Sequence, residues 1–238
     1  KISLLEPIVK LLIKKFPQIT SIINNINSSN ANISLGESQN TLYGKNFIIE
    51  KLGKYNFIIS PDSFFQVNTK QAKLLYDIIV EEANLTGKEI VYDLFCGTGS
   101  IALYLSQYAK HIYGFEIVES AIKDAKQNAL NNKVNNVSFF EGNLESIFRK
   151  NLNIKNLDSP DVIVVDPPRA GLHPKTVMDA LEKAPSKIVY ISCNPASQAR
   201  DVSLFCKSKY KLIKLRPVDM FPHTPHIENI ATLIYGND

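Results

Sequence analysis

Four short groups of residues in this chain carry side chains suited to chemistry. They are DLFCGTGS at 93–100, DPPR at 166–169, SCNP at 192–195 and DMFPHTPHIE at 219–228. Each follows an apolar run typical of a buried strand. Ligands of open α/β sheets bind at the carboxyl ends of the strands. We therefore expect the four groups to lie together at one edge of a sheet.

The glycine loop is typical of nucleotide binding. Gly97 and Gly99 let the backbone approach a ligand closely, and the following helix start offers free N–H groups. Glu116 ends the next apolar run, where a carboxylate can accept hydrogen bonds from both ribose hydroxyls of an adenosine-type ligand. Asn143, after the third run, is placed to bond the adenine. Asp93 favours S-adenosylmethionine, because a carboxylate can accompany its cationic end; a dinucleotide, or a plain tight turn, stays open.

The DPPR group predicts a rigid wall beside the cofactor. Pro167 and Pro168 fix φ and cannot donate hydrogen bonds. Methyltransferases that act on exocyclic amines often carry an aromatic residue after a similar Pro-Pro. Here the residue is Arg169, which argues against amine methylation and suits a phosphate or base contact. An ordinary loop exit is the alternative.

The chain has three cysteines, an odd number at wide spacing, which excludes a disulfide framework and the usual metal-binding spacings. Cys193 ends a strand beside a helix start, where a thiol pKa can fall below its usual ~8.5 and yield a nucleophile. The commoner fate of a free cysteine is a small buried hydrophobe. We predict that fate for Cys206, placed in mid-helix. Cys96 is predicted to pack, and it is the rival nucleophile.

The last group holds two histidines and a glutamate. Pro225 between His223 and His226 forbids the helical metal-binding geometry of an H-E-x-x-H motif, so we expect no metal. We predict instead a rigid loop that aims Glu228 into the site as a general base. A basic run precedes it, consisting of Lys207, Lys209, Lys211, Lys214 and Arg216. This run is either a solvated edge strand or a phosphate contact.

Helices and apolar runs alternate from residue 70 onward. The patterns predict helices over 70–83, 100–109, 119–132, 144–152, 175–184 and 196–208. Strand-like runs lie at 89–99, 111–117, 136–143, 161–169, 187–195, 210–221 and 229–236. Continuous apolar strands separated by helices predict a parallel sheet covered on both faces. The last two strands have no helix between them, which predicts an antiparallel pair.

Residues 1–60 have a different texture, rich in Asn, Ser and Ile. A helical pattern opens them, and Gly44 and Gly53 punctuate strand-like pieces that predict a β-hairpin or small meander. We therefore predict a small α+β segment at 1–60 and a larger domain at 61–238. The segment is either a packing appendage or a substrate-binding attachment. Because the chain begins at Lys1 rather than Met, we expect it to be part of a longer protein.

The totals narrow the class of protein. The chain has 238 residues, 45% hydrophobic and 21% charged, which excludes intrinsic disorder. No apolar run approaches the ~20 residues that span a bilayer, and the first residues lack a signal-peptide pattern. The net charge of +4 permits a nucleic-acid partner without demanding one. A reducing, cytoplasmic location is the simplest expectation.

Taken together and in order, these motifs resemble the S-adenosylmethionine-dependent RNA uracil-5-methyltransferases, which make 5-methyluridine. The resemblance runs from about Pro17 to the C-terminus. Its carriers are SPDSFFQVN (60–68), DLFCGTG (93–99), DPPRAGL (166–172), YISCNP (190–195), ARD (199–201) and DMFPHTPHIE (219–228). It implies a Rossmann-like class I methyltransferase domain, a mostly parallel sheet with an antiparallel terminal strand.

The resemblance also implies roles for single residues. Cys193 would be the nucleophile and Glu228 the base, with Phe64 and Phe65 holding a flipped base. The residues implied around the cofactor, besides the two glycines, are Gln66, Phe95, Ser100, Glu116, Asn143 and Asp166. The position of Ser100 often carries Asn in the family. Such enzymes usually have an N-terminal RNA-binding barrel, and many add a cysteine-ligated iron–sulfur cluster; neither is recognisable in these residues.

We therefore expect methyl transfer from S-adenosylmethionine to carbon 5 of a uridine in RNA. Large-subunit (23S) ribosomal RNA is the preferred substrate, because segment 1–60 resembles the ribosomal branch of the family more than the transfer-RNA branch. Transfer RNA is the alternative. An NAD-dependent oxidoreductase would leave Cys193 and Glu228 unexplained, and a non-catalytic RNA-binding module would make both residues dispensable.

Overall fold

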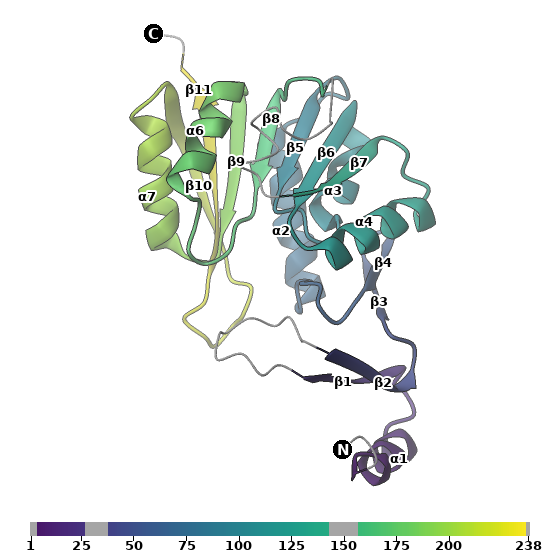
Figure 1. The fold of residues 1–238 in the computed structure, drawn as a ribbon. Helices are drawn as coiled ribbons and strands as arrows, with labels where there is room; N and C mark the ends of the chain where they lie inside the picture. The colour runs from purple at the N-terminus through teal and green to yellow at the C-terminus, as the bar shows by residue number, and fades with distance from the viewer. Residues whose placement is uncertain (1–3, 27–37, 143–156, 237–238) are drawn as a thin grey trace.

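The computed structural model describes residues 4–26, 38–142 and 157–236 (Figure 1). A seven-stranded sheet with the order β10-β11-β9-β8-β5-β6-β7 forms its centre. The strands are β5 (Ile90–Leu94), β6 (His111–Glu116), β7 (Val137–Glu141), β8 (Val162–Val165), β9 (Lys187–Ser192), β10 (Tyr210–Val218) and β11 (Glu228–Tyr235). Strands β5 to β9 pair in parallel, and β11 runs antiparallel to both β9 and β10. The predicted fold class is confirmed.

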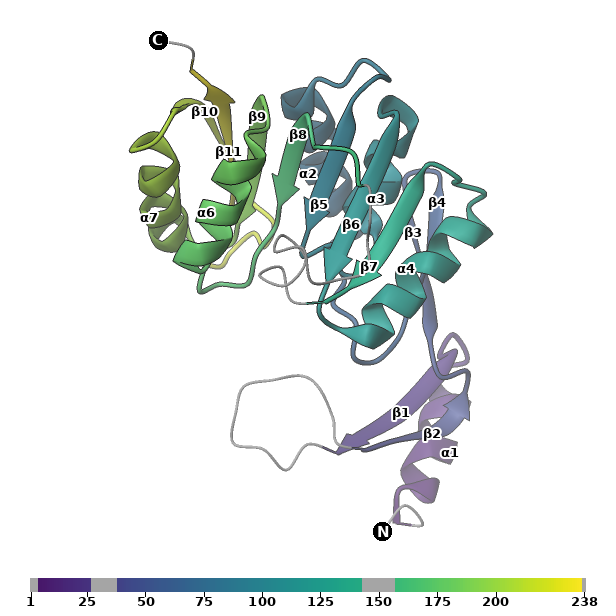
Figure 2. The same cartoon turned by 45° about the horizontal axis from the view of Figure 1, so that its top comes forward.

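Helices cover both faces of this sheet (Figures 1 and 2). One face carries α2 (Thr69–Ala83), α3 (Ser100–Leu105) and α4 (Glu119–Asn131), and the other carries α6 (Pro174–Lys183) and α7 (Pro195–Cys206). Along β9, Val189 and Ile191 join the first core cluster, and Ile188 and Tyr190 join the second. Burial of both faces explains why this strand has an unbroken apolar run.

Three details of the predicted elements differ or fall outside the described ranges. The helix expected over 100–109 ends at Leu105 and continues as a 3₁₀ turn, Ser106–Tyr108. The prediction that Cys206 is buried in mid-helix is wrong, because it is the last residue of α7 and is exposed there. The helix expected over 144–152 lies outside the described residues. No helix within those residues is long and apolar enough to cross a membrane.

The N-terminal part contains α1 (Glu6–Lys15) and two antiparallel pairs of strands. These are β1 (Ser21–Ile26) with β2 (Ser38–Gly44), and β3 (Ile48–Leu52) with β4 (Tyr55–Ile59). The expected hairpin is confirmed, and Gly53 turns it with a φ of +59°. Side chains of β3 and β4 enter the core beneath α2–α4, whereas α1 has no buried residue. The domain division after residue 60 stays a prediction.

The polar face of α4 takes the place of a neighbouring strand beside β4. Asn128 accepts a hydrogen bond from the Ile58 N–H at 2.6 Å and donates to the Ile58 carbonyl at 3.1 Å. Asn132 repeats the pair of bonds on Asn56, at 2.9 and 2.8 Å. Four residues of helix rise about 6 Å, close to the repeat of two strand residues. The match fixes the register of the hairpin against the sheet domain.

One turn earlier, Asp124 holds the segment that follows the hairpin. Its carboxylate accepts from the Ser60 N–H and hydroxyl, both at 2.8 Å, and from the Ser63 hydroxyl at 2.9 Å. Asn128 also donates to the Thr98 carbonyl in the glycine loop at 3.2 Å. Helix α4 therefore connects the glycine loop to the segment that carries Phe64, Phe65 and Gln66.

Candidate functional site

The two glycines of the loop after β5 are required for different structural reasons. Phe95, Gly97 and Gly99 all adopt positive φ, at +63°, +50° and +78°. A Cβ at Gly99 would lie 2.7 Å from Cζ of Phe139, so only glycine fits there. A Cβ at Gly97 would meet only the Phe64 carbonyl oxygen, at 3.9 Å. Gly99 therefore serves packing, whereas Gly97 borders space that a ligand can enter.

Glu116 lies beside this loop at the end of β6. Its Oε2 accepts from the Gly97 N–H at 3.2 Å. Its Oε1 accepts from the Ile117 and Val118 N–H groups, at 2.7 and 3.0 Å. A carboxylate has about four acceptor positions, so this one retains capacity for ribose hydroxyls. The loop and the acid therefore lie as an adenosine-type ligand requires.

A small pocket of about 40 Å³ opens at the loop. Its lining residues are Phe64, Phe65, Gln66, Tyr76, Phe95, Cys96, Gly97, Thr98, Ser100, Ile101 and Asp166. Most residues expected around the cofactor are thus brought together, while Asn143 lies outside the described residues. Sequence reasoning missed Tyr76, because its position on the apolar side of a helix is also that of an ordinary core residue.

Two buried polar side chains at the loop are poorly satisfied, and for Asp93 the contact that remains is with the Ala102 backbone N–H. Neither carboxyl oxygen of Asp93, nor the Thr98 hydroxyl, makes a hydrogen bond of good geometry within the described ranges. Burial raises the pKa of Asp93 well above its usual range, and the nearby Asp166 carboxyl raises it further. A cationic ligand would oppose both effects. The buried carboxyl group of Asp93, an open Gly97 and a free acceptor on Glu116 together fit a cationic adenosine compound.

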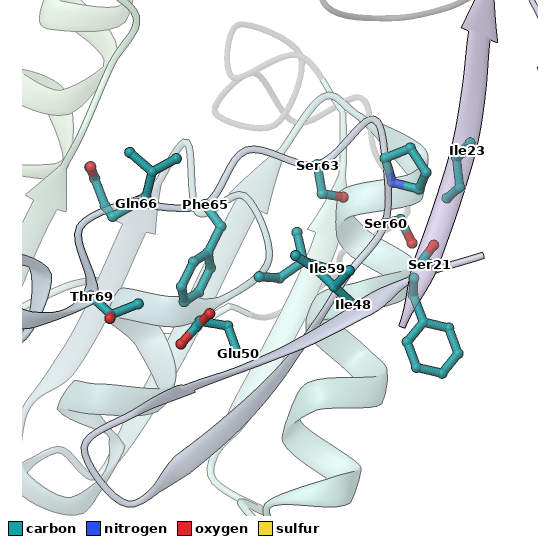
Figure 3. Close-up of a pocket in the computed structure, with 13 residues that line it drawn as sticks. Ser21, Ile23, Ile48, Glu50, Ile59, Ser60, Ser63, Phe65, Gln66 and Thr69 are labelled. Carbon is teal, nitrogen blue, oxygen red and sulfur yellow. The ribbon is translucent and has the colours of Figure 1, made fainter. Parts of the chain in front are cut away.

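A larger hollow of about 510 Å³ lies on the other side of the segment that carries Phe65 and Gln66. Figure 3 shows Phe65 and Glu50 turned toward one another, with Thr69 beside them and Ser60 and Ser63 toward the other end of the hollow. The wall is formed by β1, by β3 and by residues 59–69. The small pocket thus adjoins a space large enough for a nucleotide.

The pairing of β9 with β11 brings Cys193 and Glu228 together. Ser192 pairs with Asn229 in this antiparallel ladder, so the next step of the register sets Cys193 opposite Glu228. Side chains alternate between the two faces of a strand. Ile191 and Ile230 point into the core beneath α2–α4, and Cys193 and Glu228 fall on that same face. The two residues therefore meet on the side of the sheet that carries the glycine loop.

Two carboxyl groups at this edge have strongly raised pKa values. Burial raises the pKa of Glu228 to about 7, and the Arg169 guanidinium opposes the shift. Burial and the charge of Glu228 raise the pKa of Asp166 to about 7. Near neutral pH, each group can therefore exchange a proton readily.

The Cys193 thiol does not have the lowered pKa that its place beside a helix start suggested. Burial raises its pKa, Glu228 and Asp166 raise it further, and Arg169 partly offsets them. That expectation was wrong because the carboxyl groups supplied by neighbouring strands were not visible in the local sequence. Cys96, the rival nucleophile, is buried in the core, as expected for packing, and burial raises its pKa well above the usual value.

A buried clamp holds the loop after DPPR. Asp201 is fully buried and accepts from the Tyr190 hydroxyl at 2.6 Å and the Leu172 N–H at 2.7 Å. Arg200 donates to Asp201 and to the Leu172 carbonyl. A Cβ at Gly171 would lie 2.5 Å from Asp201 Oδ2. The ARD motif therefore fixes the backbone that leads from Arg169.

The exposed histidines of the loop before β11, His223 and His226, do not form part of a metal cluster. Within the ranges that the structure describes, no group of three or more His, Cys, Asp or Glu side chains is arranged to hold a metal ion. The basic run begins with Lys207 and Lys209, before β10, and continues along that strand. Lys214 and Arg216 pair with Glu81 and Glu82 of α2, while the other basic side chains of the run remain exposed.

Solved structures related to this chain share its fold. The Pyrococcus abyssi tRNA (uracil-54, C5)-methyltransferase in complex with S-adenosyl-L-homocysteine matches with a TM-score of 0.74 and 35% identity, over 93% of this chain and 53% of that one. An rRNA methylase of Streptococcus thermophilus matches with a TM-score of 0.53 over 70% of this chain and 97% of that one. At 15% identity, the latter supports the fold alone.

Sequence relatives define the family. An RNA methyltransferase of Staphylococcus aureus is 46% identical over 226 residues, 94% of this chain and 49% of the relative. One from Oceanobacillus iheyensis is 46% identical over 96% of this chain and 49% of its own length. The chain thus spans about half the length of the curated relatives it matches. A family model described as tRNA (Uracil-5-)-methyltransferase matches residues 32–234, and the chain belongs to that family.

Proposed function

We propose that this chain forms the catalytic part of an enzyme that transfers a methyl group from S-adenosylmethionine to carbon 5 of a uridine in RNA. The observation that carries the proposal is the cross-strand position of Cys193 and Glu228 beside the glycine loop. A thiol and a buried acid at one edge of the sheet are the two groups that this reaction needs from the protein.

The proposed chemistry begins at the thiol. Carbon 5 of uracil is a weak nucleophile. Addition of the Cys193 thiolate to carbon 6 turns carbon 5 into the nucleophilic carbon of an enolate. When bound, S-adenosylmethionine would supply an electrophilic methyl group to that carbon; the S–CH3 bond breaks, its electron pair stays on sulfur, and S-adenosylhomocysteine is the leaving group. Glu228, as a carboxylate, then takes the carbon-5 proton, so that the electrons of that C–H bond re-form the ring double bond and expel the thiolate. Nucleophile and base each return to their starting state once Glu228 loses its proton to solvent.

The pKa values of the side chains support these roles for Cys193 and Glu228. The thiol has a raised pKa and must lose a proton before it adds. Glu228 and Asp166, each with a pKa of about 7, are suited to accept protons near neutral pH. Arg169 favours both the thiolate and the Glu228 carboxylate. We assign Glu228 to the carbon-5 proton because it lies opposite Cys193 in the ladder.

The cofactor would be held across the end of β5. Glu116 would accept from the ribose hydroxyls, and Asn143 would contact the adenine. The remaining side chains and backbone of this proposed set are those of Gln66, Phe95, Gly97, Ser100 and Asp166; Gly99, expected in the same set, would act by allowing the tight turn of the loop. Phe64, 72% exposed beside the pocket, is available with Phe65 and Arg169 to stack on a base that has left its helix. Extrusion of that base costs a few kcal/mol, which such stacking would offset.

The proposed substrate is large-subunit ribosomal RNA in the cytoplasm, because segment 1–60 resembles the ribosomal branch of the family. Transfer-RNA uridine is the second candidate, favoured by the likeness to the P. abyssi tRNA enzyme. Incubation with labelled S-adenosylmethionine and equal amounts of each RNA, followed by mass mapping, would decide between them. Methylation confined to transfer RNA would refute the ribosomal assignment.

The covalent step has its own test. Wild-type protein should form a denaturation-resistant adduct with RNA that carries 5-fluorouridine, since fluorine cannot leave as a proton does. Cys193→Ala should abolish the adduct, whereas Cys206→Ala, at the exposed end of α7, should not. Glu228→Gln should accumulate a methylated adduct on ordinary RNA. Loss of the adduct in Cys96→Ala but not in Cys193→Ala would overturn the choice of nucleophile.

A further inference from the structure

Two hydroxyl groups share one hydrogen bond on the wall of the small pocket. The Tyr76 hydroxyl, from α2, lies 2.8 Å from Oγ of Ser100, at the start of α3. Tyr76 is only 4% exposed, and both residues line the pocket together with Gln66 and Asp166. Neither hydroxyl has another hydrogen-bond partner in the part of the chain that the structure describes.

A count of protons shows what this pair offers to a ligand. Each hydroxyl carries one proton, and the bond between them uses one of the two. Whichever group donates, the other keeps a free O–H. Burial raises the pKa of Tyr76, with Asp166, Asp93 and Glu228 adding to the effect, so its proton stays in place. The pair therefore presents one donor to the pocket and behaves as a unit.

The order of the strands indicates which end of the cofactor this donor meets. Strand β5 lies between β6, which ends in Glu116, and β8, which leads into Asp166. A ligand whose ribose reaches Glu116 therefore extends toward the β8 side, where Tyr76 and Ser100 lie. The acids on that side, Asp93 and Asp166, suit a cationic group, and a hydroxyl donor suits a carboxylate. An amino-acid end carries both kinds of charge.

We propose that Tyr76 and Ser100 form a hydroxyl pair that binds the carboxylate of the amino-acid end of S-adenosylmethionine. This assignment rests on the proposed function and goes beyond it, because it names a residue of α2 as part of the cofactor site. It also gives the Tyr76 side chain a purpose that core packing alone would not require, since a phenylalanine fills the same space without the hydroxyl.

Two ligands that differ only at the amino-acid end provide the test. S-adenosylhomocysteine carries that end, and 5′-methylthioadenosine keeps the adenosine and the thioether without it. Calorimetry should show that Tyr76→Phe and Ser100→Ala each weaken S-adenosylhomocysteine about tenfold, the loss expected for a hydrogen bond to a charged group. Affinity for 5′-methylthioadenosine should change less than twofold. The double variant should lose at least as much as either single one, because each single variant leaves one hydroxyl with a proton to donate.

Tyr104→Phe is the matched control. Tyr104 packs against Tyr76 with ring centroids 5.5 Å apart, but its hydroxyl donates to Asp77, away from the pocket. This variant should bind both ligands as the wild type does. Unchanged S-adenosylhomocysteine affinity in both pocket variants, or an equal loss for the two ligands, would overturn the assignment. Failure of the wild type to bind either ligand would instead refute the proposed function.

Discussion

The hydrogen bonds between α4 and β4 allow a sharp test of what holds the hairpin to the sheet domain. Asn128 is fully buried and satisfies the Ile58 N–H and carbonyl as well as the Thr98 carbonyl. Asn132 makes the same two bonds to Asn56, one helical turn later and in contact with solvent, and a third to the Asn128 carbonyl at 2.8 Å. The two side chains therefore have the same local chemistry but differ in access to water.

This difference sets the expected magnitudes. Asn128→Ala leaves three backbone groups without their partner, the Thr98 carbonyl buried and the two groups of Ile58 half-buried. Each such loss costs ~1–3 kcal/mol at full burial. We expect a total of about 3 kcal/mol, because the carbonyls keep partial alternatives. At the position of Asn132, water replaces the lost partner, so Asn132→Ala should cost about 1 kcal/mol or less. The gain in helix propensity from Asn to Ala applies to Asn128, inside α4, rather than to Asn132, the C-cap residue; at under ~1 kcal/mol it offsets only part of the loss at Asn128.

Urea unfolding followed by circular dichroism measures the two costs. With a slope near ~3 kcal/mol per molar for a chain of this size, Asn128→Ala should lower the midpoint by about 1 M. Asn132→Ala should lower it by a third of that or less. Equal shifts in the two variants would refute the view that burial, rather than the number of hydrogen bonds, sets the strength of this contact.

Four further predictions concern charge and backbone. Burial raises the pKa of Glu228 from 4.5 to about 7, so its contribution to stability is lost as the pH rises from 4.5 to 7. The free energy of unfolding of Glu228→Gln should therefore exceed that of the wild type at pH 8, by up to about 3 kcal/mol, and equal it at pH 4. Glu82 is the opposite case, since hydrogen bonds from Lys214, Arg216 and Thr232 lower its pKa despite burial. Glu82→Gln should destabilise the fold at pH 7 by about 1–3 kcal/mol. Thermal melts should show that this loss shrinks as the pH falls below 4.5. Single-turnover methyl transfer should rise with pH through about 7 as Glu228 and Asp166 ionise, and a flat profile from pH 6 to 8 would count against their roles. Gly171→Ala should lower the melting temperature by several degrees, because φ of Gly171 is +79° and the added Cβ meets Asp201. An unchanged melting temperature would show that the backbone at residue 171 shifts readily and is not held by Asp201.

Much of the fold was predictable because its signals are local. Unbroken apolar runs such as those of β8 and β9 identify strands buried on both faces, and the last two strands lack a connecting helix. The contacts of α4 with β4 were not predictable in this way. Asp124, Asn128 and Asn132 recur at every fourth position, a pattern also typical of a solvated helix face. Only the placement of the hairpin decides that these side chains bond to backbone groups.

The site was predictable to a similar degree, and for the same reason. Motifs at strand ends identified the side chains that line the pocket, because the chain must return each parallel strand to the same edge. The raised pKa of Cys193 was not predictable, since it depends first on burial and then on acids at the ends of β8 and β11. Tyr76 gave no signal either, because helical periodicity reports burial and does not report which hydroxyl faces a ligand.

The direction of β11 explains how Glu228, the proposed base, reaches Cys193, the proposed nucleophile. In a wholly parallel sheet the first residue of a strand lies at the edge opposite the ligands. Because β11 runs antiparallel to β9, its first residue, Glu228, lies at the carboxyl edge beside Cys193. A register slip of one residue would turn Glu228 to the other face. Gln198 opposes such a slip, since its amide donates to the Tyr190 and Asn229 carbonyls at 2.8 and 3.0 Å and so ties the two strands at one register.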